Sequence, residues 1–330
     1  MSNNKQYITF LLLTILLFTG SWLRLFTGEV AVGFSQINEL FSHGSTANLI
    51  ILHHRLPALI NAVFVGAGLS LAGYFMQIVF KNALAGPYIL GVASGAGLFV
   101  AVFLLTGVSG ILAQFGLPFF AVLGAMSIAL LLLILLAKIR QTTTILIIGV
   151  LISSVATAII SLLQYFSPDE KLKKFVIWTM GNLESSTLNQ SFGIACVVLV
   201  AFVFAFFYRK QINLLLLPFA KAYSLGLNVK KTQLYVLFVA SAVTGISVAF
   251  CGPVGFVGII VPHISAMLVK SRLAEKNVGL LFLTGANIVL YADLLAHLPH
   301  NALLPVNAVL AVFGIPVIFY IVLRKKAVVV

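Results

Sequence analysis

The chain consists of long apolar runs separated by short polar segments. A run of about 20 apolar residues is long enough to cross a bilayer as a helix, and the pattern predicts ten such helices. Two windows are the least regular, because 88–106 opens on glycines and 256–269 is short. The ten windows are 7–23, 57–79, 88–106, 114–137, 143–165, 191–208, 232–250, 256–269, 278–297 and 304–323.

The segments between these runs are short, and no repeat, low-complexity linker or soluble domain stands out. The first run is followed by equally apolar runs and lacks a clear small-residue cleavage site, so it is interpreted as a retained span and not as a signal peptide. We therefore expect residues 1–330 to form a single transmembrane domain.

Composition excludes a soluble protein. The chain is 61% hydrophobic and only 8% charged, whereas a soluble domain is about half apolar and about a quarter charged. The predicted fold class is an all-α polytopic membrane protein.

The net charge of +13 would suggest a nucleic-acid partner in a soluble protein. Here the charges sit between apolar runs, where the excess of Lys and Arg on the cytoplasmic side of a membrane explains them. With the N-terminus inside, ten spans leave five of the 20 Lys and Arg residues outside, and most acidic residues fall outside. The pattern predicts an N-in, C-in topology and no nucleic-acid partner. The five outer residues are Arg24, Arg55, Lys171, Lys173 and Lys174.

Catalytic and metal-binding motifs are missing from the sequence. No G-x-x-x-x-G-K-[S/T] loop is present, so the chain does not bind ATP through a P-loop of its own. Histidines occur near the predicted outer surface at His53, His54, His297 and His300. Transition metals need ligands that converge with defined geometry, which the sequence does not indicate. We predict no catalytic residues, no metal site and no bound cofactor.

Polar residues inside a predicted span are costly and therefore informative. Ser154, Thr157, Ser161 and Gln164 follow one another at spacings of 3, 4 and 3, which places them on one helical face. They are either the wall of a hydrophilic path or hydroxyls and an amide that bond to their own or neighbouring helices. Asp293 lies four residues before His297 near an outer end. We expect it to form an ion pair with His297 or Arg55 more readily than a proton relay.

Glycines at regular spacing predict close helix contacts. Pro262 leaves a backbone carbonyl without its donor, a gap that membrane helices fill with neighbouring groups or water, and His263 is expected to fill this structural role. The glycines that we expect at close contacts or hinges are Gly66, Gly68, Gly73, Gly91, Gly95, Gly252, Gly255 and Gly258.

The longest predicted inner connection, 209–233, is basic and amphipathic. Pro218 is expected to open a short segment and Gly226 to end one. Such a connection either lies on the membrane surface or docks a cytoplasmic partner.

Four ordered stretches carry a family resemblance. They are RLPALINAVFVGAGLSLAGYFMQ (55–77), NALAGPYILGVASGAG (82–97), GPVGFVGIIVPH (252–263) and LPVNAVLAVFGIPVIFYIVLRK (304–325). Together they resemble the FecCD-type permeases, the membrane subunits of ABC importers for iron–siderophore complexes, haem and cobalamin.

The resemblance implies a type II ABC importer permease with ten helices in the cytoplasmic membrane. It implies a homodimer or pseudo-dimer with the translocation path at its interface, and a bulky metal chelate as cargo, an iron–siderophore foremost. It also implies two separate ATPase subunits that use ATP and Mg, and an extracytoplasmic substrate-binding protein.

The family's ATPase contact maps onto residues 218–228, which we call the coupling segment. The residues carried over are Pro218, Phe219, Lys221, Ala222, Leu225, Gly226 and Asn228. The family's outer arginines dock the binding protein; Arg55 matches one of them, and His297 stands where another often sits. Ala58 replaces a further arginine, and Pro218-Phe219 replace a Gly-Glu pair.

Two other functions stay open at the level of the sequence. An ion-coupled secondary transporter needs an acidic residue near the midplane, and the one candidate, Asp293, lies near an end of its span. An intramembrane metalloenzyme would use the histidines and hold a stoichiometric metal.

Overall fold

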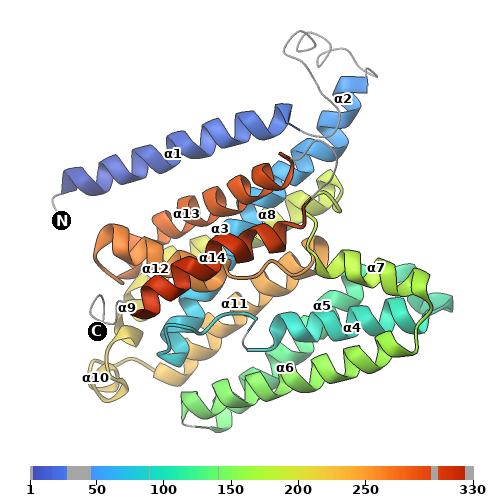
Figure 1. Cartoon of the computed structure of the whole chain (residues 1–330). Coiled ribbons are helices and arrows are strands. Elements are labelled where there is room, and N and C mark those ends of the chain that lie inside the picture. Colours follow the sequence, from blue (N-terminus) through green and yellow to red (C-terminus); the bar gives the residue numbers. More distant parts are fainter. Residues whose placement is uncertain (1–2, 28–45, 89, 140, 299–303, 324–330) are drawn as a thin grey trace.

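The computed structural model describes residues 3–27, 46–88, 90–139, 141–298 and 304–323. Within these ranges the regular structure is entirely helical (Figure 1). The prediction of ten apolar helices is confirmed, since every window coincides with one helix. These helices are α1 (Asn3–Phe26), α3 (Leu56–Phe80), α4 (Val92–Thr106), α5 (Gly116–Lys138), α6 (Thr142–Tyr165), α8 (Leu188–Phe207), α11 (Val229–Cys251), α12 (Val257–Val269), α13 (Ala274–Ala296) and α14 (Val306–Leu323).

Seven of the ten contain an apolar stretch long enough to cross a membrane, and three are shorter: Val92–Thr106, Val257–Val269 and Val306–Tyr320. Two of these three are the irregular windows. Each of these two helices begins after a residue with a positive φ, because Gly91 has a φ of 83° directly before α4 and Phe256 a φ of 65° directly before α12. An L residue with a Cβ adopts this backbone only at a cost.

Short helices lie at the two ends of the bundle. Near one end are α2 (Thr46–Ile50), the π-helical turn η2 (Ile51–Arg55) and α7 (Asp169–Thr179), and near the other are α9 (Arg209–Leu216) and α10 (Phe219–Ser224) (Figure 1). A 3₁₀ turn, η3 (Gly110–Phe115), precedes α5.

Helix α3 is the centre of the fold. Twenty of its 25 residues are buried, and it packs against α8, α11, α12 and α13. Small residues allow these approaches: a Cβ added to Gly66 would overlap the carbonyl of Gly285 on α13, and one added to Gly73 would overlap the carbonyl of Gly258 on α12. Glycine pairs bring helix backbones together in membranes in this way.

Helices α4, α5 and α6 form a second group, which joins the first through contacts between α5 and α11. The peripheral helices are α6, which packs mainly on α4, and α14, which packs on α12 and α13. Their outer faces are apolar and exposed, with Leu151 and Val155 on α6 and Val312 and Phe319 on α14 as examples.

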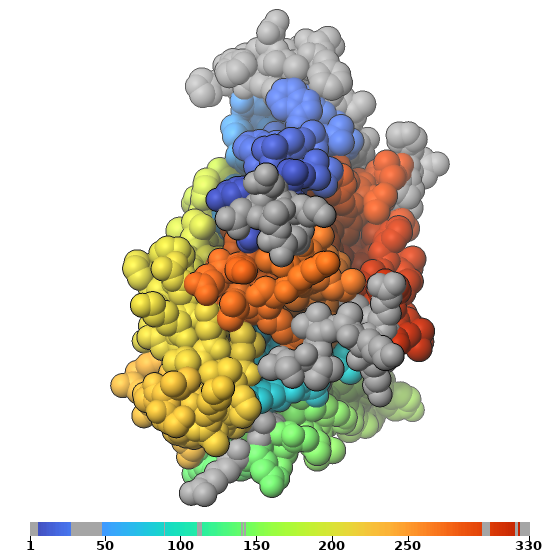
Figure 2. All heavy atoms as spheres, turned by 90° about the vertical axis from the view of Figure 1, so that its left-hand side faces the viewer, coloured from blue at the N-terminus to red at the C-terminus, as the bar shows by residue number. Residues whose placement is uncertain are grey.

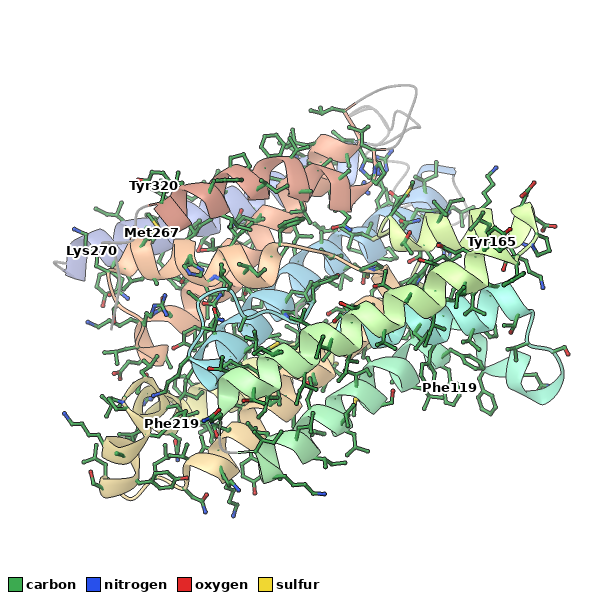
Figure 3. The ribbon with its side chains drawn as sticks, turned by 60° about the horizontal axis from the view of Figure 1, so that its bottom comes forward. Phe119, Tyr165, Phe219, Met267, Lys270 and Tyr320 are labelled. Carbon is green, nitrogen blue, oxygen red and sulfur yellow. The ribbon has the colours of Figure 1, made fainter. Side chains whose placement is uncertain are left out.

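The end of the bundle that carries α9 and α10 is basic, as the sequence predicts, with Arg209 and Lys210 on α9, Lys221 on α10 and Lys230 at the start of α11. The first residues of α1 and the last of α14 lie at the same end as α9 and α10 (Figure 1). Figure 3 shows Phe219 and Lys270 at this end and Tyr165 at the opposite one. Figure 2 views the end that carries α9 and α10, which is the side predicted to face the cytoplasm.

Candidate functional site

A cleft runs along the free face of α6. It has a volume of about 550 Å³ and is lined by Tyr88, Val150, Ser153, Ser154, Thr157, Ala158 and Ser161. Three of the four residues predicted as a polar stripe therefore lie in one cleft, whereas Gln164 does not line it. We call this space the α6 cleft.

The hydroxyl groups of the α6 cleft donate to their own helix. Ser154 Oγ donates to the carbonyl of Val150 at 3.0 Å, and Thr157 Oγ1 to that of Ser153 at 2.9 Å. Ser161 Oγ donates to the carbonyl of Thr157 at 3.0 Å. The hydroxyl donors are satisfied within α6, as one of the two interpretations of the sequence expects. The oxygen lone pairs keep weak acceptor character, and a role as the wall of a hydrophilic path stays a prediction.

The floor of the α6 cleft belongs to the irregular segment between α3 and α4. Tyr88 lines the cleft, and its neighbours Ala85, Gly86, Pro87 and Leu90 are buried. We call the described residues 82–88, 90 and 91 the cleft loop. It ends at Gly91, whose amide donates to the carbonyl of Tyr88 at 3.3 Å.

The glycines expected at close contacts hold the cleft loop and its neighbours together. A Cβ on Gly258 would lie 2.9 Å from Pro87 Cδ, and one on Gly95 would lie 2.5 Å from the carbonyl oxygen of Gly124. The amide of Gly255 donates to Asn307 Oδ1 on α14 at 3.0 Å. A close approach is thus the physical reason for glycine here, and movement as a hinge stays a prediction.

Pro262 lies inside α12, which continues through it without a break. His263 Nδ1 lies 2.7 Å from the carbonyl oxygen of Ile259, and Gln77 Nε2 on α3 donates to the same oxygen at 3.2 Å. Pro262 leaves the carbonyl four residues before it without a donor. The buried imidazole of His263 bonds to the next carbonyl along the helix, that of Ile259, and so has a structural partner beside this gap.

A buried charge cluster lies at the opposite, outer end. Arg24 is fully buried and contacts Asp293 through Nε and Glu184 Oε1 through Nη2, the latter at 2.6 Å. His297 Nε2 lies 3.1 Å from Glu184 Oε1, and His297 Nδ1 lies 3.7 Å from Asp293 Oδ1. We call Arg24, Glu184, Asp293 and His297 the outer charge cluster.

The cluster shifts the pKa values of its two members outside the spans. A hydrogen bond with His297 is the largest cause that lowers the pKa of Glu184 to about 2; burial opposes it and Arg24 adds to the lowering. Burial lowers the pKa of His297, but the hydrogen bond with Glu184 and the charge of Asp293 raise it to a net value above the usual one. The arrangement favours the Glu184 carboxylate beside an imidazolium.

The structure corrects the expected partner of Asp293. Its main partner is Arg24 and not Arg55, while His297 is a secondary neighbour. Arg55 is only 3% exposed, and its Nη1 donates to the carbonyl of Leu25 at 2.7 Å. The side chains of both residues predicted to dock a binding protein, Arg55 and His297, bond to other groups of this chain. Their docking role stays a prediction.

The coupling segment forms a capped helical turn with an exposed rim. Ala222 is fully buried and anchors α10, whereas Tyr223 and Leu225 are 54% and 55% exposed. Gly226 adopts a left-handed φ of 82° and ends α10, as the sequence predicts. Asn228 Oδ1 then accepts the amide of Lys231 at 3.1 Å and caps α11.

Lys221 and Phe219 complete this surface. The side chain of Lys221 is exposed, and the ring of Phe219 lies under the ammonium of Lys81, which is 3.9 Å from the ring centroid. Among the residues that the structure describes, no group of three or more His, Cys, Asp or Glu is suited to a metal ion. His300 lies outside the described residues.

Sequence reasoning missed Arg24, Tyr88 and Lys81. Arg24 sits at the end of an apolar run, where a flanking arginine usually reaches the membrane interface. The acidic residues near the outer face were a clearer signal for Arg24. A buried carboxylate such as Asp293 requires a partner of opposite charge.

Comparison with known proteins places this geometry in a family. The sequence matches the FecCD transport family over residues 12–324. It is 32% identical to the Fe(3+) dicitrate transport system permease protein FecD of Escherichia coli over 307 residues, which cover 92% of this chain and 94% of FecD. It is 31% identical to the hemin transport system permease protein HmuU of Yersinia pestis over 284 residues, which cover 84% of each protein.

A solved structure agrees with the fold. It is described as an inward-facing conformation of a metal-chelate type ABC transporter, and it superposes with a TM-score of 0.84 at 29% identity, covering 96% of this chain and 99% of that chain. The helical bundle and these matches define a multi-pass membrane permease of the ABC importer class, which is a transport subunit and not an enzyme. The chain belongs to the FecCD transport family.

Proposed function

We propose that this permease moves a bulky metal chelate across the cytoplasmic membrane, with an iron–siderophore as the first candidate and haem or cobalamin as the others. The α6 cleft carries this proposal. Its described lining has serine and threonine hydroxyl groups and part of the Tyr88 side chain, whose phenol oxygen is buried, but no charged side chain. Such a wall offers a chelate weak contacts and no strong ligand, which suits release after each cycle.

A pair of permease chains completes the path in this proposal. The α6 cleft is open along one side, and both α6 and α14 have exposed apolar faces. A second copy covering these faces would enclose the cleft between two chains. The assembly is then a homodimer of single transmembrane domains, or a pseudo-dimer with a related chain.

The energy comes from two separate ATP-binding subunits that use ATP with Mg. The coupling segment is the contact proposed for them, because its exposed Tyr223 and Leu225 stand on a helix anchored by the buried Ala222. The basic end of the bundle, which carries α9 and α10, faces the cytoplasm in this arrangement.

Cargo arrives through an extracytoplasmic substrate-binding protein at the outer end. Docking through Arg55 and His297 requires that these engaged side chains become accessible in the complex. In the proposed cycle, loaded binding protein docks, ATP closes the two ATPase subunits, and the coupling segment passes this movement to the helices around the α6 cleft. The path then opens toward the other side.

The proposal is tested by uptake into proteoliposomes that contain the permease with its co-purifying ATPase and binding protein. Radiolabelled ferric hydroxamate, haem and cobalamin are supplied separately, with and without ATP. We expect ATP-dependent uptake of one of them. Thr157→Trp should block it by filling the α6 cleft, whereas Val200→Trp, on the exposed face of α8, should not. Equal uptake by both variants would argue against the cleft as the path.

The two other functions make different predictions in the same preparation. An ion-coupled transporter would lose uptake when the proton gradient is dissipated and would keep it without ATP. A metalloenzyme would retain a stoichiometric metal through purification, which elemental analysis detects. Either result would replace the importer cycle.

A further inference from the structure

Lys81 occupies a strained backbone position directly after α3. Its φ of 47° is left-handed, and it is one of three non-glycine residues with a positive φ, with Phe256 and Lys270, in the part of the chain that the structure describes. Its amide donates to the carbonyl of Ile78 at 3.3 Å, and the next amide, that of Asn82, to Gln77 at 3.2 Å. Glycine or asparagine usually holds such a helix end, so a lysine here suggests a use for its side chain.

The side chain reaches the beginning of the coupling segment. Lys81 Nζ donates to the carbonyl oxygen of Leu217 at 2.5 Å and lies 3.9 Å from the centroid of the Phe219 ring. One ammonium thus holds both neighbours of Pro218, through a charge-assisted hydrogen bond and a cation–π contact. In Figure 2 the end of α3 and the residues after it reach the same face as α9 and α10.

The backbone of Lys81 leads straight into the cleft loop. That loop is compact: the amide of Ala85 donates to the carbonyl of Asn82 at 3.1 Å, and that of Leu90 to Gly86 at 3.2 Å. Pro87 packs on Gly258 of α12, and Tyr88 lines the α6 cleft. A displacement of Leu217 or Phe219 therefore acts on Tyr88 through the side chain of Lys81 and residues 82–88, which are exposed at Ala83 and Leu84 and buried from Ala85 to Pro87.

We propose that Lys81 is a positioning residue that transmits movement of the coupling segment to the cleft loop. The inference rests on the proposed function, because it requires the coupling segment to be the contact of the ATPase. Lys81 itself touches neither the nucleotide nor the proposed path; it sets the position of the loop that carries Tyr88.

The test measures uptake and ATP hydrolysis together in proteoliposomes that contain the full complex. Lys81→Met removes the ammonium and keeps an unbranched side chain that is shorter by one atom. We expect the complex to assemble and hydrolyse ATP, but uptake per ATP hydrolysed to fall roughly three- to thirtyfold, the range in which residues between coupled sites act. Lys81→Arg keeps both contacts and should restore most of the coupling.

Lys270 provides a matched control. It has the same left-handed backbone, with a φ of 55°, and also follows a helix, α12, at the same end of the bundle. Lys270→Met should leave uptake per ATP unchanged. If Lys81→Met also leaves uptake per ATP unchanged, the proposed transmission is refuted. If both variants lose coupling equally, a general effect of lysines at this surface replaces it.

If Lys81→Met assembles poorly, Phe219→Leu alone tests the contact, because it removes the ring under the ammonium of Lys81 and should also lower uptake per ATP hydrolysed. Where both single variants assemble, a double-variant comparison gives a second test. Phe219→Leu removes the ring face, and Phe219→Leu in a Lys81→Met chain should lower coupling no further, because both changes break one contact. Additive losses would overturn the proposal. A photo-crosslinking residue at the exposed Tyr223 separates the two claims: loss of the crosslink to the ATPase refutes the proposed coupling segment, whereas an intact crosslink with normal Lys81→Met coupling refutes only the transmission.

Discussion

Arg24 on α1 donates through Nη2 to Glu184 Oε1 at 2.6 Å, which joins the first helix to the connection between α7 and α8. The same guanidinium contacts Asp293 on α13. Helix α1 makes most of its contacts with α13 and is otherwise largely exposed. The outer charge cluster is therefore a specific anchor for the outer end of α1.

Removing this anchor should destabilise the permease strongly. Arg24→Leu leaves Asp293, only 1% exposed, without its compensating charge, and breaking a buried ion pair in this way costs about 3–5 kcal/mol. We expect a lower thermal midpoint of the detergent-solubilised protein. Arg24→Leu with Asp293→Leu should recover much of the loss, because apolar groups replace the pair.

The control for this change is an ion pair at the surface. Lys174 and Glu170 on α7 lie 2.8 Å apart with side chains 63% and 82% exposed, where solvent screens the attraction. Lys174→Met should leave the thermal midpoint unchanged. An Arg24→Leu protein as stable as Lys174→Met would contradict the anchoring role.

The outer charge cluster should also make stability depend on pH. His297 has a raised folded pKa, so its contribution is complete below its unfolded pKa of about 6.5 and is lost as pH rises through the folded value. Glu184 has a folded pKa of about 2, so its contribution is complete above its unfolded pKa of about 4.3 and is lost as pH falls. The two contributions overlap between these unfolded values.

Thermal midpoints measured between about pH 6 and pH 9 test the contribution of His297 to stability. The unchanged protein should lose stability as pH rises through this range, and His297→Gln should flatten the slope. His53→Gln, a change at an exposed histidine near the same end, should keep the slope. A slope that survives His297→Gln would assign the pH dependence to another group.

Gly73 should tolerate no side chain. A Cβ there overlaps the carbonyl of Gly258, so Gly73→Ala forces α3 and α12 apart at a cost of about 1–3 kcal/mol, typical of overpacking. Gly193 on α8 has no atom within 4 Å of an added Cβ, and Gly193→Ala should be neutral or slightly stabilising. Thermal midpoints of the two variants measure the difference, and equal effects would exclude the close contact.

The sequence predicts the spans well, because hydrophobic length and the glycine spacing are local signals. It also predicts the start and end of α10 at Pro218 and Gly226, whose backbone preferences act over one or two residues. The partner of Asp293 could not be derived in the same way. Arg24 is 269 residues away in sequence, and its approach depends on how α1 packs against α13.

The α6 cleft also combines a local feature that the sequence predicts with a contact between distant residues that it does not predict. Helical periodicity places Ser154, Thr157 and Ser161 on one face. Tyr88 belongs to the cleft loop, and only the folding of the chain brings it next to that face. Gln164 shares the spacing but does not line the cleft. Spacing along one helix predicts a face, and the neighbouring helices decide how far along that face a cleft extends.

Gly226 tests the coupling segment through its backbone alone. Its φ is 82°, and no atom lies within 4 Å of an added Cβ, so a substitution meets backbone strain and no steric clash. Gly226→Val should disturb the end of α10 by about 1–2 kcal/mol or more and lower uptake per ATP hydrolysed. Gly226→Asn, which tolerates this backbone, should retain most of the coupling. Normal coupling in Gly226→Val would remove this turn from the proposed contact.

The most direct test of the importer assignment is the mass of the intact complex. The chain is tagged in its native cell, extracted in mild detergent and weighed with its bound partners by native mass spectrometry. The account predicts two permease chains, or one with a related chain, together with two subunits that carry a P-loop. A permease that carries no ATP-binding subunit, under conditions that preserve a control ABC transporter, would contradict the account.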